Sequence, residues 1–129
     1  MASHVYPLAK QSFESAGINL TSATIKVALL TSAYTYSAAH QFRSSLSGVV
    51  QLSGALTTKA VTNGVFSADN VTFPAVASGS TIVALALYVD TGSSATDNLI
   101  AFVDGFSQAT NGGDIIVAWD AGSNKIFAL

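Results

Sequence analysis

The sequence predicts a mainly β fold, an antiparallel β-sandwich or barrel of about seven or eight strands with one N-terminal helix. Short runs rich in Val, Ile, Thr and aromatic residues alternate with turn-forming residues along most of the chain. Half of the residues (50%) are apolar, which allows a sizeable buried core. The 129 residues match one ordinary domain, so residues 1–129 are expected to form a single β-sandwich unit.

The expected helix lies near the N-terminus, from about Tyr6 to Ala16. Pro7 suits a first helical position, and Gly17 suits the position just past a helix end. Its apolar side would consist of Leu8, Ala9, Phe13 and Ala16. The helix would be about residues 6–16, with strands from about residue 24 onward.

The strand pattern begins at Thr24 with "TIKVALLT", and a loop-like segment from Ser32 to Gly48 follows it. The later expected strands are "GVVQL", "ALTTKAVT", "GVFSADNVTFPAV", "STIVALALYVD", "NLIAFVDGF", "GDIIVAWD" and "NKIFAL". Turn residues separate them, and Asn63-Gly64 is the best tight-hairpin signal because both residues tolerate positive φ. Within "ALTTKAVT", Leu56 is expected to point inward and Thr57 outward.

The apolar run from Ile82 to Val89 shows no alternation between apolar and polar residues. A strand of this kind is expected to be covered on both faces. The core would cover one face, and either the helix or a second protein chain would cover the other.

The charge content is unusually low. Only 9% of the residues are charged, against about a quarter in average globular proteins, and the net charge is −2. Five scattered basic residues argue against nucleic-acid binding, which needs clustered Lys and Arg. A surface of hydroxyl, amide and small apolar groups favours contacts with other proteins, because little charge must be desolvated on docking.

Targeting and redox signals are also sparse. The chain has no cysteine, which excludes disulfides and thiolate chemistry. We expect no signal peptide, because the N-terminal residues lack a charged region followed by an apolar core. We expect no membrane span either, because the apolar run from Ile82 to Val89 is far shorter than the roughly 20 residues that a spanning helix needs.

The sequence Asp90-Thr91-Gly92-Ser93 follows that apolar run and locally resembles the catalytic motif of a dimeric aspartic protease. Such an enzyme needs two carboxylates that share a proton. Retroviral proteases are dimeric enzymes of this kind. Their domains place the motif early and need most of their fold after it, whereas here the motif lies in the final third of the chain. Asp, Thr, Gly and Ser are also ordinary turn formers, so a strand-to-strand corner is the favoured interpretation.

Other catalytic and ligand-binding patterns are weak. The chain has no Gly-x-Ser-x-Gly elbow, phosphate loop or dedicated calcium loop, so we expect no enzymatic activity, no metal site and no cofactor. Trp119 is expected in the core. A sugar-binding module would instead need exposed aromatic residues, of which the strands leave few.

One loop is aromatic and carries the only arginine. Its candidate protein-interface residues are Tyr34, Tyr36, His40, Phe42 and Arg43. Tyrosine and arginine are favoured interface anchors. The alternative is that this loop folds back over an edge of the sheet, and the residues alone leave both possibilities open.

The whole chain resembles a family of small structural proteins of tailed bacteriophages. The resemblance is carried by "LAKQSFESAGINL", "TIKVALLTSAYTY", "NGVFSADNVTFPAV", "ALALYVDTGSSATDNLIAFVDGF" and "GGDIIVAWDAGSNKIFAL". It implies a non-enzymatic virion protein, above all a capsid decoration (cement) protein that binds the lattice of the major capsid protein and associates with itself as a homo-oligomer. It would be made in the host cytoplasm and lie on the outer surface of the capsid.

Three alternatives remain open at this point. A phage tail or neck component is the alternative within the same class. A carbohydrate-binding β-sandwich module and, remotely, a dimeric aspartic protease acting through Asp90-Thr91-Gly92 are alternatives of other classes.

Overall fold

The computed structural model of the chain describes residues 2–15, 17–62, 65–119 and 127–128. Its centre is a five-stranded antiparallel sheet. From one edge to the other, the strands are β1 (Ala2–Val5), β9 (Leu99–Asp104), β8 (Ala84–Val89), β2 (Ile25–Leu30) and β3 (Val49–Leu52). The mainly β, antiparallel fold with one N-terminal helix is therefore confirmed.

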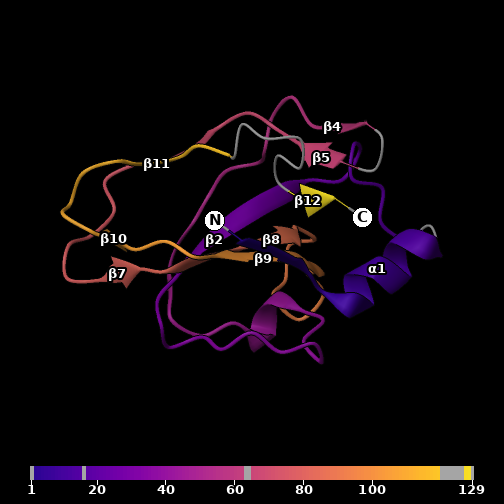
Figure 1. The fold of residues 1–129 in the computed structure, drawn as a ribbon, viewed down its shortest axis with the longest axis horizontal. Helices are drawn as coiled ribbons and strands as arrows, with labels where there is room; N and C mark the ends of the chain where they lie inside the picture. Colours follow the sequence, from indigo (N-terminus) through magenta and orange to yellow (C-terminus); the bar gives the residue numbers. More distant parts are fainter. Residues whose placement is uncertain (1, 16, 63–64, 120–126, 129) are drawn as a thin grey trace.

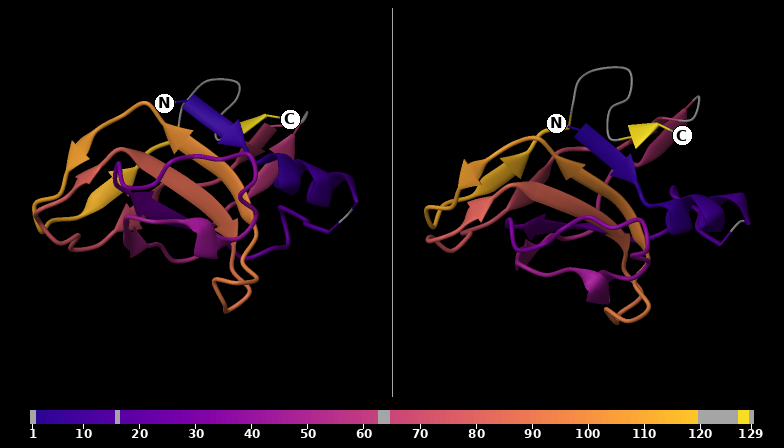
Figure 2. Two further views of the ribbon diagram at one scale, coloured as in Figure 1. Left: turned by 90° about the horizontal axis from the view of Figure 1, so that it is seen from below. Right: turned by 60° about the horizontal axis from the view of Figure 1, so that its bottom comes forward.

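Three smaller antiparallel sheets complete the fold. They pair β12 (Phe127–Ala128), β5 (Val65–Ser67) and β4 (Ala60–Thr62); β11 (Ile115–Val117) and β6 (Val71–Phe73); and β10 (Gln108–Ala109) and β7 (Thr81–Ile82). Figure 1 shows β4, β5 and β12 on one side of the central strands and the loop that leaves β2 on the other. In Figure 2, the helix α1 lies at one end of the molecule, and β7, β10 and β11 lie at the opposite end.

The helix α1 (Pro7–Glu14) is shorter than expected but begins as predicted, with Pro7 in its first turn. Proline is suited to this place because the first N–H groups of a helix have no intrahelical partner. Gly17 lies just past the helix, and its N–H donates to the carbonyl of Ser12. The helix packs near β9, and the buried Ala9 is its innermost residue.

Two features of the strand pattern differ from the sequence prediction. The strand β1 precedes the helix, although strands were expected only from about residue 24, because its four residues are too few and too polar to show a pattern. The expected strand "ALTTKAVT" is reduced to β4, because Thr58 adopts a positive φ of 53° that ends extended structure before Lys59. Within this segment, Leu56 is buried and Thr57 exposed, as predicted.

The expected strand through Ile82 to Val89 is divided at Val83. Ile82 belongs to β7 and pairs with β10, whereas Ala84 begins β8 in the central sheet. The β8 strand is buried along almost its whole length, and its residues contribute alternately to two separate apolar clusters. Coverage on both faces is therefore confirmed.

The two clusters lie on opposite faces of the central sheet. Val27, Leu29, Leu85 and Leu87 point toward the small sheets, where they meet residues such as Phe73. Ala28, Leu30, Ala84, Ala86 and Tyr88 point the other way and are covered by residues of α1 and of the loop after β2. The second cover is thus part of the same chain.

The hairpin signal at Asn63-Gly64 lies outside the described residues, as do Gly122, Ser123 and Asn124, where the sequence predicts the last turn. The strands that flank the first signal pair in antiparallel register, with Thr62 opposite Val65. Trp119 lies in the larger core cluster with 6% exposure, as predicted, and its indole N–H donates to the carbonyl of Asp69.

Candidate functional site

The loop from Thr31 to Gly48 lies across one face of the central sheet, and we refer to it as the strap. Its two ends are held together, because the N–H of Thr31 donates to the carbonyl of Gly48. Gly48 has a φ of +63°, and a Cβ at this position would collide with the side chains of Thr31 and Ala33. Glycine is therefore required where the strap returns to the sheet as β3.

Buried hydroxyl groups attach the first part of the strap to the rest of the protein. The hydroxyl of Tyr34 lies 2.7 Å from that of Tyr6 and 2.8 Å from Nδ1 of His40. Burial, together with the hydrogen bond to Tyr34, raises the pKa of Tyr6 far above its usual value, and burial also raises the pKa of Tyr34. Both tyrosines therefore stay neutral at physiological pH and bond as hydroxyl groups.

An ion pair attaches the second part of the strap. The guanidinium Nε of Arg43 lies 2.7 Å from Oδ2 of Asp97, whose side chain is fully buried. The main-chain N–H of Arg43 donates to the carbonyl of Asp97, and the guanidinium lies 5.1 Å from the ring centroid of Tyr88. The short helix η1 (Arg43–Ser45) begins at this arginine.

Asp97 accepts two further hydrogen bonds, from the N–H and the hydroxyl of Thr91, at 2.6 and 2.8 Å. Burial on its own would raise the pKa of Asp97. The N–H of Thr91, the Arg43 guanidinium and the Thr91 hydroxyl outweigh it and hold the pKa below its usual value. A buried carboxylate thus ties the strap to the connection between β8 and β9.

The five candidate interface residues all belong to the strap, but most of their aromatic surface points inward. Tyr34 is 6% exposed and belongs to the core cluster on this face. The other four, which are Tyr36, His40, Phe42 and Arg43, are half-buried. The strap therefore folds over the face of the sheet and not merely over its edge, and partner contact by these residues stays a prediction.

The outward side of the strap carries small and uncharged side chains. Its exposed residues are Ser32, Ala33, Thr35, Ala38, Ala39, Gln41, Ser44, Ser45 and Ser47. Between Lys26 and Lys59, the only Asp, Glu, Lys or Arg is Arg43, which is paired inside the molecule. The strap and the adjoining edge strand β3 thus form a continuous segment without an unpaired formal charge.

The Asp-Thr-Gly-Ser motif begins the connection from β8 to β9, as the turn interpretation predicted. The carboxylate of Asp90 lies 2.7 Å from the ammonium group of Lys26 and accepts the N–H of Gly92. The hydrogen bond from Lys26, followed by that from Gly92, holds the pKa of Asp90 below its usual value. This ionised, ion-paired environment differs from that of a protease aspartate, which shares a proton with a second carboxylate.

The aromatic residues near the strap form a tilted cluster and not a flat platform. The Tyr34 and Phe102 rings are 5.7 Å apart and inclined by 52°, and the Tyr36 and Phe102 rings are inclined by 36°. Phe102 is only 7% exposed. These three rings do not form the coplanar, exposed aromatic surface that would favour a sugar-binding module.

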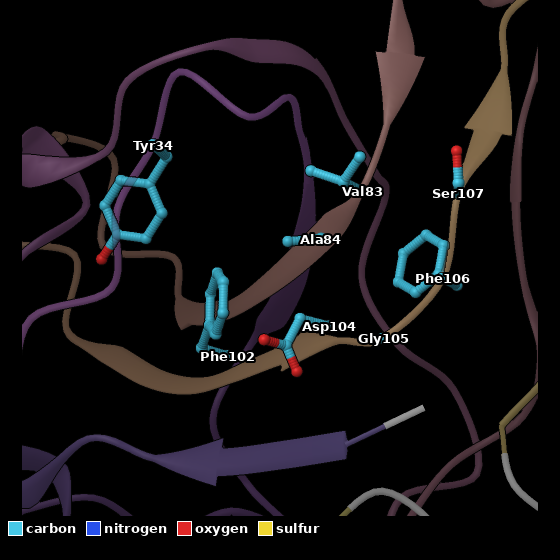
Figure 3. Close-up of a pocket in the computed structure, with 8 residues that line it drawn as sticks. All are labelled: Tyr34, Val83, Ala84, Phe102, Asp104, Gly105, Phe106 and Ser107. Carbon is cyan, nitrogen blue, oxygen red and sulfur yellow. The ribbon is translucent and has the colours of Figure 1, made fainter.

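Beside the strap, the surface is hollowed into an open groove of about 580 Å³. Figure 3 shows the groove between Tyr34 on one side and Phe106 on the other, with the Asp104 carboxylate between them. It is lined by Tyr34, Val83, Ala84, Phe102, Asp104, Gly105, Phe106 and Ser107. Of these, only Tyr34 was a candidate interface residue from the sequence.

The sequence carried a weak signal for the remaining groove residues. Asp104 is the first charged residue after the buried run of β9, and Gly105, with a φ of 86°, turns the chain toward Phe106. This pattern locates a strand end, but it does not reveal which loop lies beside that end. Only the folded strap brings Tyr34 to the same groove.

Comparisons with known proteins provide no family assignment. No family model matches the chain, and no curated protein is significantly similar to it. Within the described residues, no three His, Cys, Asp or Glu side chains are grouped so that they could hold a metal ion. A search of the same part of the chain finds no helix with the length and apolar character needed to cross a membrane.

Proposed function

We propose that this chain is a non-enzymatic structural protein of a phage virion, a decoration protein that binds the outer surface of the head shell. The specific class rests on the resemblance to small phage structural proteins described above. The observation that carries the docking role is the uncharged segment made by the strap and β3. Docking such a surface on a protein lattice costs little desolvation of charge.

The edge strand β3 supports the same proposal. Among the described residues, β2 is its only strand partner, and it exposes Val49 by 41% and Leu52 by 39%. Edge strands of soluble proteins usually carry a charge or a proline that prevents pairing with other chains. The strand β3 has neither, so its open edge can accept a strand or an apolar surface of a capsid subunit or of a second copy.

A decoration protein of this kind acts by mass action, because it binds the assembled lattice and thereby stabilises it. Self-association into a small homo-oligomer would cover part of the same apolar edge. A position in the tail or neck is the second candidate within this class, and the same uncharged surface would serve it.

The proposal is tested by co-sedimentation of the purified protein with intact heads and, separately, with tails of the phage that encodes it. We expect binding to heads and not to tails. Binding to tails alone would move the protein to the tail or neck, and binding to neither would contradict a virion role.

A variant tests the docking edge. Leu52→Lys places a charge on β3 and should reduce head binding at least about tenfold, because a desolvated lysine at an interface is strongly unfavourable. Val61→Lys is the matched control, since Val61 is 47% exposed and lies on the separate strand β4. Equal head binding by the two variants would remove β3 from the proposed interface.

A further inference from the structure

The groove beside the strap combines an apolar floor with a single carboxylate. Val83 and Ala84 line one wall, and Phe102 and Phe106 contribute aromatic carbon. Asp104 is the only charged residue among the lining residues. A ligand that fills this groove must therefore present apolar surface along most of its length and one group that complements a negative charge.

The Asp104 carboxylate is held at the groove and is incompletely paired. It ends β9, whose last residue is fixed in register opposite Ala2 of β1. Its side chain is 42% exposed, and its partner is Nε2 of His4 at 3.4 Å, which forms an ion pair only when the histidine is protonated. Across the described part of the chain, no lysine or arginine forms a salt bridge with Asp104.

The aromatic residues around this carboxylate favour an organic cation over a small metal ion. Tyr34 and Phe102 lie with ring centroids 5.7 Å apart on one side of the groove, and Phe106 lies on the other. Aromatic faces attract ammonium and guanidinium groups, and the attraction increases where water is partly excluded. The volume of about 580 Å³ leaves room for a long side chain with its hydrocarbon stem.

From this geometry we infer that the groove binds a lysine or arginine side chain presented by a protein partner. The hydrocarbon stem packs on Val83, Ala84 and Phe106, and the cationic end pairs with Asp104 beside the ring of Phe102. Long basic side chains suit such a site because their stems are apolar and only their ends are charged. This inference deepens the proposed decoration function, on which its choice of a protein partner rests.

The groove also complements the uncharged surface next to it. The strap and β3 supply area without formal charge, whereas the groove supplies one directional charge contact at the border of the strap, since Tyr34 belongs to both. Charge pairs across an interface mainly determine orientation and partner choice. A basic side chain in the groove would therefore fix how the protein sits on its partner.

The first test measures the groove itself with small probes. The probes are Nα-acetyl-lysine methylamide and Nα-acetyl-arginine methylamide, whose side chains keep their positive charge. Each is titrated into isotope-labelled protein, and the amide chemical shifts are followed by NMR. N-acetyl-norleucine methylamide is the neutral control, because it keeps an apolar stem and lacks the cation. We expect millimolar binding of the two cations, at least about fivefold tighter than norleucine, with shifts at Ala84, Phe102 and Phe106.

A matched pair of variants assigns the binding to Asp104. Asp104→Asn should abolish the preference for the cations, whereas Glu14→Gln removes the same charge from an exposed position on α1 and should leave that preference unchanged. Equal affinity for lysine and norleucine in the wild-type protein would overturn the inference, as would an unchanged preference in Asp104→Asn. The NMR spectrum of each variant reports directly whether it is folded.

The second test separates this inference from the proposed function. In head co-sedimentation, Asp104→Asn should bind several-fold more weakly than Glu14→Gln, with a loss that is largest at low salt. Equal head binding by the two variants would overturn the role of the groove while leaving the decoration function intact. If the wild type binds the small cations but no heads, the decoration function fails and the cation site of the groove stands.

Discussion

The two faces of the central sheet are covered in different ways. One face packs against the small sheets through buried aliphatic and aromatic side chains, including Phe66 and Phe73 at 0% exposure. The other face is covered by the strap and α1, and this cover is attached through the Tyr6–Tyr34–His40 hydrogen bonds and the Arg43–Asp97 ion pair.

The difference shows how a segment without regular structure can cover a sheet. Strands can satisfy their backbone groups by pairing, so apolar packing is enough to hold the small sheets in place. The strap contains little regular structure and many small side chains, and Tyr34 is its only buried residue. Its position therefore depends on a few polar contacts with defined geometry. Removing one of these contacts by mutation should destabilise the strap without disrupting the opposite face of the sheet.

The largest effect is expected on the packed face. Phe73→Ala removes a fully buried ring between β6 and the central sheet, and should lower the free energy of unfolding by about 3–5 kcal/mol. Urea denaturation followed by tryptophan fluorescence measures this change. A loss below about 1 kcal/mol would show that the small sheets contribute little to the stability of the core.

The second effect concerns the ion pair of the strap. Asp97→Asn leaves the partly buried guanidinium of Arg43 without a charged partner, and should cost about 2–3 kcal/mol. Hydrogen exchange should accelerate at the amides of Arg43 and Leu99, which bond across the strap contact, and stay slow in the centre of β2. Equal acceleration on both faces would contradict separate attachment of the strap.

The same carboxylate predicts a pH dependence. Because the folded state lowers the pKa of Asp97, its contribution is fully present above the unfolded value of about 3.9 and is lost as the pH falls through the lower folded value. The stability difference between the wild type and Asp97→Asn should therefore be constant from pH 7 to pH 5 and shrink below about pH 4. Denaturation curves at a series of pH values test this. A difference that does not change in acid would show that the ionisation of Asp97 does not hold the strap.

The third effect concerns the buried hydroxyl groups. Tyr34→Phe keeps the ring but removes the hydroxyl between Tyr6 and His40, and should cost about 1–2 kcal/mol. Tyr36→Phe is the matched control on the same strap, because its hydroxyl forms no hydrogen bond with the described residues and its ring is half-buried. Equal losses in the two variants would indicate that the hydroxyl network does not position the strap.

The smallest effect is expected for Asp90→Asn. Its ion pair with Lys26 lies at the surface, where solvent screens the attraction, so the denaturation midpoint should shift less than in Phe73→Ala, Asp97→Asn or Tyr34→Phe. The wild type and this variant should also both lack proteolytic activity on an unfolded protein substrate. Cleavage by the wild type that disappears in Asp90→Asn would instead revive the protease alternative.

Much of the fold follows from local sequence. The β-rich class, the helix that begins at Pro7, the buried position of Trp119 and the double burial of β8 all reflect local composition and periodicity. These properties depend on neighbouring residues and on apolar content, which the sequence displays directly. The short strands β1 and β10 were missed because segments of two to four residues carry too little periodicity.

The tertiary structure alone decided what lies on the second face of the sheet and what forms the groove. The apolar run from Ile82 to Val89 predicts that both faces of the strand are covered, but it does not indicate which segment covers the second face. The hydrophobic effect is non-directional, so any apolar partner would serve. The strap was identified by the long-range contacts of Tyr34 with Tyr6 and of Arg43 with Asp97. The groove likewise depends on Tyr34 and Asp104, which are far apart in sequence and come together only when the strap folds over the sheet.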